Sequence, residues 1–147
     1  MTLHNQDPAD AVAYSTLASG VHRMMEKSFM HDLAKDFSLH EMQCSDGSHA
    51  VLAHPALIHG LQELRNHANA PVTIESGYRT AAHNEAIGGA TRSRHLYGMA
   101  ADVTVGGMTP AEVQAWAEQM QFGGIGYYPK FTHLDVQGKG RRWGPAL

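Results

Sequence analysis

Apolar side chains recur at helical spacing in two segments of the chain. In the first, aliphatic residues repeat every three or four positions after a His-Pro pair: Leu57, Ile58, Leu61 and Leu64. We expect this helix to span about 54–69, because proline suits a first turn and Pro71 disfavours helix before it. A second helix is expected after Thr109, which can cap it, with Pro110 in the first position and Glu112 returning a bond to the cap.

Short runs of β-branched or alternating apolar residues predict four strands, at 72–75, 101–105, 124–128 and 131–136. Glycine, proline or polar turn residues bound these runs, which is typical of strands joined by short connections. A short helix is expected at 80–87, ended by a Gly-Gly pair. Residues 37–48 predict a loop, and 138–144 predict a polar tail whose Trp143 packs back on the core.

The first 35 residues carry the weakest pattern. Asp7 and Pro8 suit a helix start, and apolar residues that could line one helical face follow at imperfect spacing: Val12, Leu17, Val21, Met24, Met25 and Phe29. Gly20 weakens or interrupts such a helix. We therefore interpret 1–35 as an N-terminal helical extension and 36–147 as a single domain that carries the chemistry.

Composition narrows the class of protein. The 147 residues, 43% hydrophobic and 17% charged, describe an ordinary globular domain with enough chain for a core. A net charge of -3 offers no basic footprint for nucleic acid, and no apolar run reaches the ~20 residues that span a membrane. Cys44 is the single cysteine, so no internal disulfide can form. No basic segment with a following apolar run opens the sequence, so we expect no signal peptide and cytoplasmic synthesis. We also expect a monomer.

Histidine and aspartate occur together in two segments, and eleven histidines in the chain raise the chance of a metal site. Residues 93–102, SRHLYGMAAD, place His95 in a loop that turns at Gly98 into a strand with Asp102 near its start. In a later strand His133 and Asp135 are two residues apart, so they share a face. Two imidazoles and a carboxylate from these segments would make the three-ligand set of a catalytic zinc site. Three unrelated polar residues are the alternative.

Arg79 follows the strand at 72–75 through a Ser-Gly turn that could aim its side chain. Its guanidinium could hold a carboxylate through two parallel hydrogen bonds, and a surface salt bridge is the alternative. Cys44 lacks a second cysteine at metal-binding spacing, so a small buried residue is the better interpretation. The glycines at 123, 124 and 126 lack a phosphate-loop pattern, and we interpret them as room for close backbone approach in a hairpin.

Four ordered motifs resemble those of the zinc D-Ala-D-Ala carboxypeptidases and related peptidoglycan peptidases, a group that includes VanY-type enzymes and several phage endolysins. They are S-G-Y-R at 76–79, S-x-H-x-x-G-x-A-x-D at 93–102, G-I-G-x-Y at 124–128 and H-x-D at 133–135. The resemblance covers about 37–143. It implies an α+β fold of the hedgehog/D-Ala-D-Ala peptidase type, in which a small, mainly antiparallel sheet carries a zinc site and helices pack against it.

The resemblance also implies a set of ligands and substrate contacts. His95, Asp102 and His133 would hold one Zn²⁺ ion per chain. Arg79 would hold the substrate or the developing oxyanion. Tyr78 and Ser93, which lie in the same motifs, are expected to contact the substrate as well.

The acid/base residue is less directly implied. Many relatives carry this carboxylate a few residues before the last histidine ligand, and the position three before His133 is Lys130 in this chain. Asp135 is the nearest carboxylate, so we expect Asp135 to act as general base. The alternative exchanges the two roles, with Asp135 on the metal and His133 as acid/base.

The function implied is zinc-dependent hydrolysis of a peptide bond in peptidoglycan stem peptides, by a carboxypeptidase or an endopeptidase. Such an enzyme would reach the cell wall as a released phage or prophage lysin, or by other delivery. The alternative is a non-catalytic zinc-containing module, either a binding domain or a phage tail structural protein. The signalling domain of hedgehog proteins is similar to this family and keeps zinc, so zinc alone does not imply hydrolysis.

Overall fold

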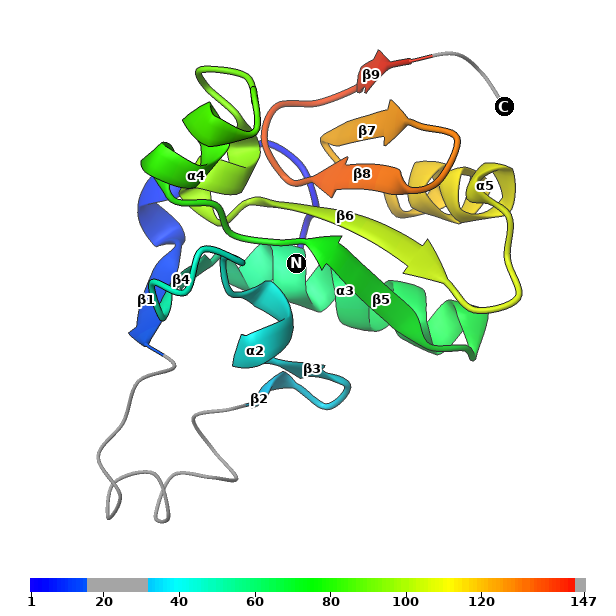
Figure 1. Cartoon of the computed structure of the whole chain (residues 1–147). Helices are drawn as coiled ribbons and strands as arrows, with labels where there is room; N and C mark the ends of the chain where they lie inside the picture. The colour runs from blue at the N-terminus through cyan, green and yellow to red at the C-terminus, as the bar shows by residue number, and fades with distance from the viewer. Residues whose placement is uncertain (16–31, 145–147) are drawn as a thin grey trace.

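A central five-stranded sheet, in the order β5-β6-β8-β7-β9, forms the body of the protein (Figure 1). The computed structural model describes residues 1–15 and 32–144. The strands of the sheet are β5 (Val72–Ser76), β6 (Ala100–Val105), β8 (Thr132–Asp135), β7 (Gly124–Tyr127) and β9 (Arg141–Trp143). All neighbours pair antiparallel except β9, which runs parallel to β7.

Helices and short two-stranded sheets surround the central sheet. The helical elements are η1 (Pro8–Asp10), α2 (Leu39–Met42), α3 (Pro55–Ala68), α4 (Ala81–Ala86), η2 (Arg94–Tyr97) and α5 (Pro110–Met120). The remaining strands pair as β1 (Val12–Ser15) with β4 (Ala50–Ala53), and β2 (Asp32–Ala34) with β3 (Phe37–Ser38). Together these elements make the α+β fold with a mainly antiparallel sheet that the sequence predicts.

Alternation of side chains along the strands separates a core face from a polar face. The odd-numbered residues of β6 join the buried apolar core, so Asp102 lies on the opposite face. Leu134 of β8 joins the same core, which leaves His133 and Asp135 on the polar face. In the register of the sheet, Asp102 pairs with His133, so their side chains emerge side by side.

The core lies between the sheet and its two long helices, α3 and α5, which cover the face away from the polar residues (Figure 1). Leu57, Leu61 and Leu64 of α3 are fully buried, as their spacing predicts. Each helix begins with a capped proline turn: the His54 side chain accepts from Ala56 N in α3, and a capping box closes the start of α5. This packing holds the sheet from behind and leaves its polar face free for chemistry.

The structure confirms most of the predicted elements. The helices expected at about 54–69, after Thr109 and at 80–87 correspond to α3, α5 and α4. The four predicted strands correspond to β5, β6, β7 and β8, each within two residues of the expected ends.

Three local predictions are wrong. Residues 37–48, predicted as a loop, contain β3 and α2, because Ser38 and Glu41 form a capping box and the apolar residues after Ser38 turn into the core. The polar tail at 138–144 contains β9, which extends the sheet beside β7. Val12 lies in a strand paired with β4, and not on a helix; residues 16–31 of that predicted helix lie outside the described residues.

The described part of the N-terminal segment contacts the rest of the fold directly. Leu3 lies in the core, Asn5 N donates to Gly138 O at 2.8 Å, and β1 pairs with β4. The division of the chain near residue 36 stays a prediction. Across residues 1–15 and 32–144, no helix combines the length and apolarity needed to cross a membrane.

Gly98 offers a direct test of how the loop before β6 is built. Its φ of 68° is left-handed, and a Cβ placed there would lie 2.5 Å from the Leu52 carbonyl oxygen. Gly98→Ala is therefore expected to lower the free energy of unfolding in urea by roughly 2–5 kcal/mol, from backbone strain and steric overlap together. Gly107→Ala is the control, since Gly107 has a φ of 74° with nothing within 4 Å of the added atom. It is expected to cost roughly 1–2 kcal/mol. Equal losses in the two variants would contradict the close approach at Gly98.

Candidate metal centre

His95 is fixed in the loop that precedes β6. The Ser93 hydroxyl accepts from His95 N at 3.3 Å and begins the short η2 turn, and Gly98 ends that turn. The Nδ1 of His95 lies 2.7 Å from the Gly77 carbonyl oxygen and donates to it, which leaves Nε2 as the metal-binding or accepting nitrogen. His95 is only 2% exposed, so its orientation is set by this contact and by the surrounding backbone.

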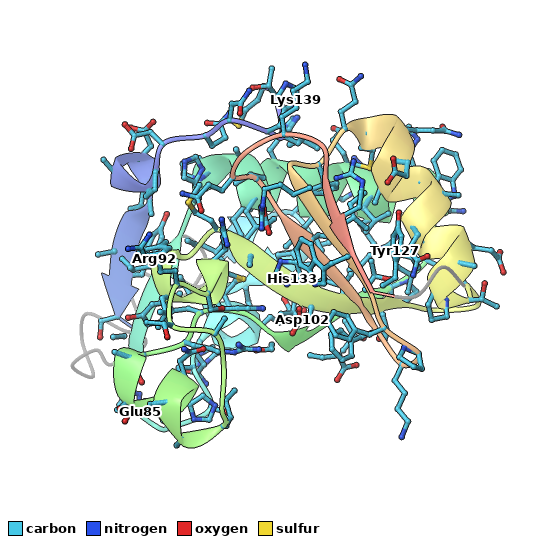
Figure 2. All side chains as sticks on the ribbon, turned by 90° about the horizontal axis from the view of Figure 1, so that it is seen from above. Glu85, Arg92, Asp102, Tyr127, His133 and Lys139 are labelled. Atoms are coloured by element: carbon cyan, nitrogen blue, oxygen red, sulfur yellow. The ribbon has the colours of Figure 1, made fainter. Side chains whose placement is uncertain are left out.

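Asp102 brings the two histidines together. Its Oδ1 lies 3.2 Å from His95 Nε2 and 3.0 Å from His133 Nδ1. The two imidazole rings meet edge to face with centroids 5.2 Å apart. Figure 2 shows Asp102 and His133 close together on neighbouring strands, as the register of β6 and β8 requires. One ligand atom from each of the three residues lies within 4.8 Å of the others.

This donor set fits a zinc ion. Two imidazole nitrogens and one carboxylate oxygen are typical ligands of catalytic zinc, which keeps a further position open. Metal-binding histidines usually donate their second N–H to a carbonyl or carboxylate, which fixes the ring. Both histidines here do so: His95 donates to the Gly77 carbonyl, and His133 Nε2 donates to Asp135 Oδ2 at 2.8 Å. The structure therefore brings together all three of the predicted metal ligands.

The structure places Asp135 behind His133 and outside the cavity lining. Its side chain is fully buried. Its Oδ2 accepts from His133, and its Oδ1 accepts from Arg141 Nη1 at 2.8 Å and from Gln137 N at 3.2 Å. Three donors thus occupy both oxygens, which is the environment of a carboxylate that orients a ligand. Asp135 is also not part of the three-residue cluster, so the exchanged arrangement with Asp135 on the metal finds no support in this geometry.

Charge at the cluster favours a cation. Burial alone would raise the pKa of Asp102, but the contacts of its carboxylate with the His133 and His95 rings outweigh burial and hold that pKa below its ordinary value. Burial would also raise the pKa of Asp135. The hydrogen bond from His133 and the charge of Arg141 outweigh burial, so this pKa is lowered as well. The pKa of His133 is raised, because the two carboxylates stabilise its protonated ring by more than burial disfavours it. Two ionised carboxylates therefore lie beside the imidazoles.

A cavity of about 470 Å³ opens over the cluster and is lined by His95, Asp102 and His133. Arg79 and Ser93 also line it, as expected of substrate contacts. Tyr78 does not line this cavity. Its backbone N donates to Met42 O, and Tyr78 lines a second hollow together with Arg79.

Sequence reasoning missed several residues of the cavity. Tyr128 and Phe131 stack at 4.6 Å in the turn between β7 and β8, and Trp143 Nε1 donates to the Tyr128 hydroxyl at 3.0 Å. Trp143 also lies against the His133 ring, with centroids 4.9 Å apart. Arg141 lies in the segment predicted as a tail. A basic and aromatic cluster directly after two glycines could have signalled a strand that returns to the site.

The glycines of β7 make room for this arrangement, as the sequence predicts. A Cβ at Gly124 would collide with Asp135, and one at Gly126 would lie 2.6 Å from Trp143 Nε1. Both positions face the polar side of the sheet, opposite Asp135 and His133 in the register. Any side chain there would displace the groups that hold His133 in place.

Comparisons with known proteins agree with this site. A family model described as Peptidase M15 matches residues 34–135, a range that contains the whole three-residue cluster. The chain is 37% identical over 82 residues to the probable peptidoglycan L,D-endopeptidase MepK of Haemophilus influenzae, covering 51% of this chain and 44% of that protein. It is 36% identical over 80 residues to the peptidoglycan L,D-endopeptidase MepK of Escherichia coli K12, covering 50% and 43%.

A third relative is named for a different activity. The chain is 37% identical over 77 residues to the zinc D-Ala-D-Ala carboxypeptidase of Streptomyces albus G, covering 50% of this chain and 30% of that protein. The chain thus spans less than half the length of each of these three curated relatives.

The placement of Asp135 predicts how its removal acts. Asp135→Asn is expected to weaken zinc binding roughly 10- to 100-fold, because His133 loses the charged acceptor that orients it. Competition with a chromogenic chelator measures that affinity. Glu118→Gln is the matched control, since Glu118 pairs with Arg142 as Asp135 pairs with Arg141, away from the cluster. Unchanged zinc affinity with lost turnover would instead assign Asp135 the general-base role.

Proposed function

Because this chain belongs to the peptidase M15 family, we propose that it is a zinc metallopeptidase that cuts a peptide bond in peptidoglycan stem peptides. The observation that carries the proposal is the buried cluster of His95, Asp102 and His133, which opens on a cavity large enough for a peptide segment. The names of the relatives support both zinc as the metal and peptidoglycan as the substrate class.

In this proposal His95 Nε2, an Asp102 oxygen and His133 Nδ1 hold the zinc ion. Zinc in such a site supplies a Lewis acid and lowers the pKa of a bound water. The protein contributes the rigidity of the site. Both histidines are anchored by their second nitrogen, and Asp102 sits in the middle of a paired strand.

Arg79 is positioned to stabilise negative charge on the substrate. Its three nitrogens donate to Ser76 Oγ at 3.1 Å, Asn84 Oδ1 at 3.3 Å and Asp102 Oδ2 at 3.4 Å. Asn84 is in turn 4% exposed and donates to Ala90 O. The guanidinium is therefore held before the substrate arrives, which is the condition under which a donor favours the transition state.

We assign Asp135 a positioning role in place of the general-base role expected from the sequence. Its hydrogen bond holds the His133 proton on Nε2 and leaves Nδ1 directed at Asp102. Arg141 holds Asp135 in turn.

A zinc-containing binding module without turnover is the second candidate function. Of the described residues that line the cavity, every carboxylate and every histidine belongs to the three-residue cluster. A carboxylate or imidazole that could accept a proton without binding the metal is therefore missing from that lining. Digestion of cell wall distinguishes the two candidates.

Narrower forms of the proposal state which peptide bond is cut and whether the protein acts as an endolysin. One of the relatives is named as an endopeptidase and another as a carboxypeptidase. An endolysin, the narrower setting expected from the sequence, must cut the intact cross-linked wall. We propose that one chain suffices, since the cluster and the cavity lining both come from a single protomer.

Zinc-loaded protein is expected to release products from purified sacculi, and a chelator is expected to stop the release. Mass spectrometry identifies the bond: loss of single alanines marks a carboxypeptidase, and stem peptides or split cross-links mark an endopeptidase. His95→Ala is expected to lose both zinc and activity, while His59→Ala, an exposed helix position, keeps both. One zinc per chain without any product would favour the binding module.

Arg79→Lys is expected to keep its zinc and lower kcat on a synthetic stem peptide roughly 100-fold, because an ammonium cannot reproduce the held guanidinium fork. Steady-state kinetics and metal analysis of the same sample separate the two effects. A rise in KM at unchanged kcat would show that Arg79 only binds substrate.

A further inference from the structure

Three arginines line the cavity, and one of them differs from the others in its pairing. Arg79 pairs with Asp102 at 3.4 Å, and Arg141 pairs with Asp135 at 2.8 Å. Arg94 instead donates from Nε to Gln137 Oε1 at 2.8 Å, and Gln137 is a neutral amide. Across residues 1–15 and 32–144, no carboxylate forms an ion pair with Arg94. The cavity therefore carries one positive charge that the described chain does not balance.

The position of Arg94 is fixed relative to the metal centre. Arg94 precedes His95 in η2, and its side chain is half-buried. The bond from Nε to Gln137 holds the guanidinium beside the chain that leaves the end of β8, two residues after Asp135. That bond engages one nitrogen, and the terminal nitrogens keep the planar fork that matches a carboxylate.

Aromatic side chains line another part of the cavity. The stacked pair of Tyr128 and Phe131 lies where β8 begins, and His133 follows two residues later. The metal centre thus lies along β8 between an aromatic end and a cationic end.

We propose that Arg94 binds a carboxylate of the substrate and so sets the direction in which a peptide lies across the metal centre. The inference rests on the proposed function and refines its substrate class to peptides with a free carboxylate on one side of the cut bond. Two carboxylates of a stem peptide share this chemistry. One is the C-terminal carboxylate, which would lie at Arg94 in an exopeptidase. The other is the free carboxylate of the D-glutamate residue.

The test combines protein variants with matched peptides. Three synthetic stem peptides are compared: one with all carboxylates free, one amidated at its C-terminus and one amidated at D-glutamate. Binding of the corresponding cleavage products to zinc-loaded protein is measured by calorimetry, and kcat and KM are measured on the intact peptides. Arg94→Gln is compared with Arg92→Gln, an exposed arginine in the same loop that does not line the cavity.

Arg94→Gln is expected to weaken binding and raise KM roughly 10- to 100-fold for the free peptide, as expected for a lost hydrogen bond to a charged group. Amidation at the recognised carboxylate is expected to cost the wild type a similar factor and to make wild type and Arg94→Gln equal. The other amidated peptide should keep the full difference, which identifies the carboxylate. Arg92→Gln should match the wild type, and Arg94→Lys should recover part of the loss.

Two results would overturn the inference: equal binding by Arg94→Gln and wild type, or the same loss on all three peptides. Zinc content and Tm of each variant separate such a loss from unfolding. Failure of the proposed function can be distinguished from failure of this inference. In that case the wild type would cut none of the peptides, while calorimetry would still report whether Arg94 binds the carboxylate.

Discussion

The carboxylate of Asp102 is buried in the middle of the sheet, and a buried charge needs partners that replace water. His95, His133 and Arg79 supply them, from a loop, the neighbouring strand and the turn after β5. These three elements are far apart in the sequence and converge on one residue that is 6% exposed. Removing any partner would leave Asp102 with less to balance its charge. The geometry of the polar face therefore depends on this one group.

The sheet protects that arrangement through a second row of contacts. Arg141 from β9 holds Asp135, and Asp135 holds the outer nitrogen of His133. The close approach of these groups is possible because β7 presents hydrogen atoms, and not side chains, at Gly124 and Gly126. On the other face, the apolar residues of the same strands pack on α3 and α5. One alternation of side chains thus builds the core and the metal centre together.

Much of the fold, and the shared face of His133 and Asp135, could be predicted from the sequence, because these features depend on the local spacing of side chains. The two-residue period of β8 predicts that His133 and Asp135 share a face, and the β-branched run after Asp102 predicts a strand. Helical spacing and caps predict α3 and α5 closely. These patterns lie within short windows of the chain, where side-chain period determines the element.

The rest depended on contacts between distant segments. The contacts of Asp135 could not be predicted, because Arg141, which donates to it, lies in a short polar segment that becomes a strand only beside β7. Tyr78 adjoins Arg79 in sequence, yet its backbone bond to Met42 directs it to a different hollow. The short strands β3 and β9 have too few residues to show a period.

We propose that His95, Asp102 and His133 together hold one zinc ion. X-ray absorption at the zinc edge of the loaded protein tests it most directly, combined with metal analysis. We predict one zinc per chain with two imidazole nitrogens at about 2.0–2.1 Å and oxygen donors completing the shell. We also predict that His133→Ala removes one imidazole from that shell. An unchanged imidazole count in His133→Ala, or a shell containing sulfur from Cys44, would contradict the account.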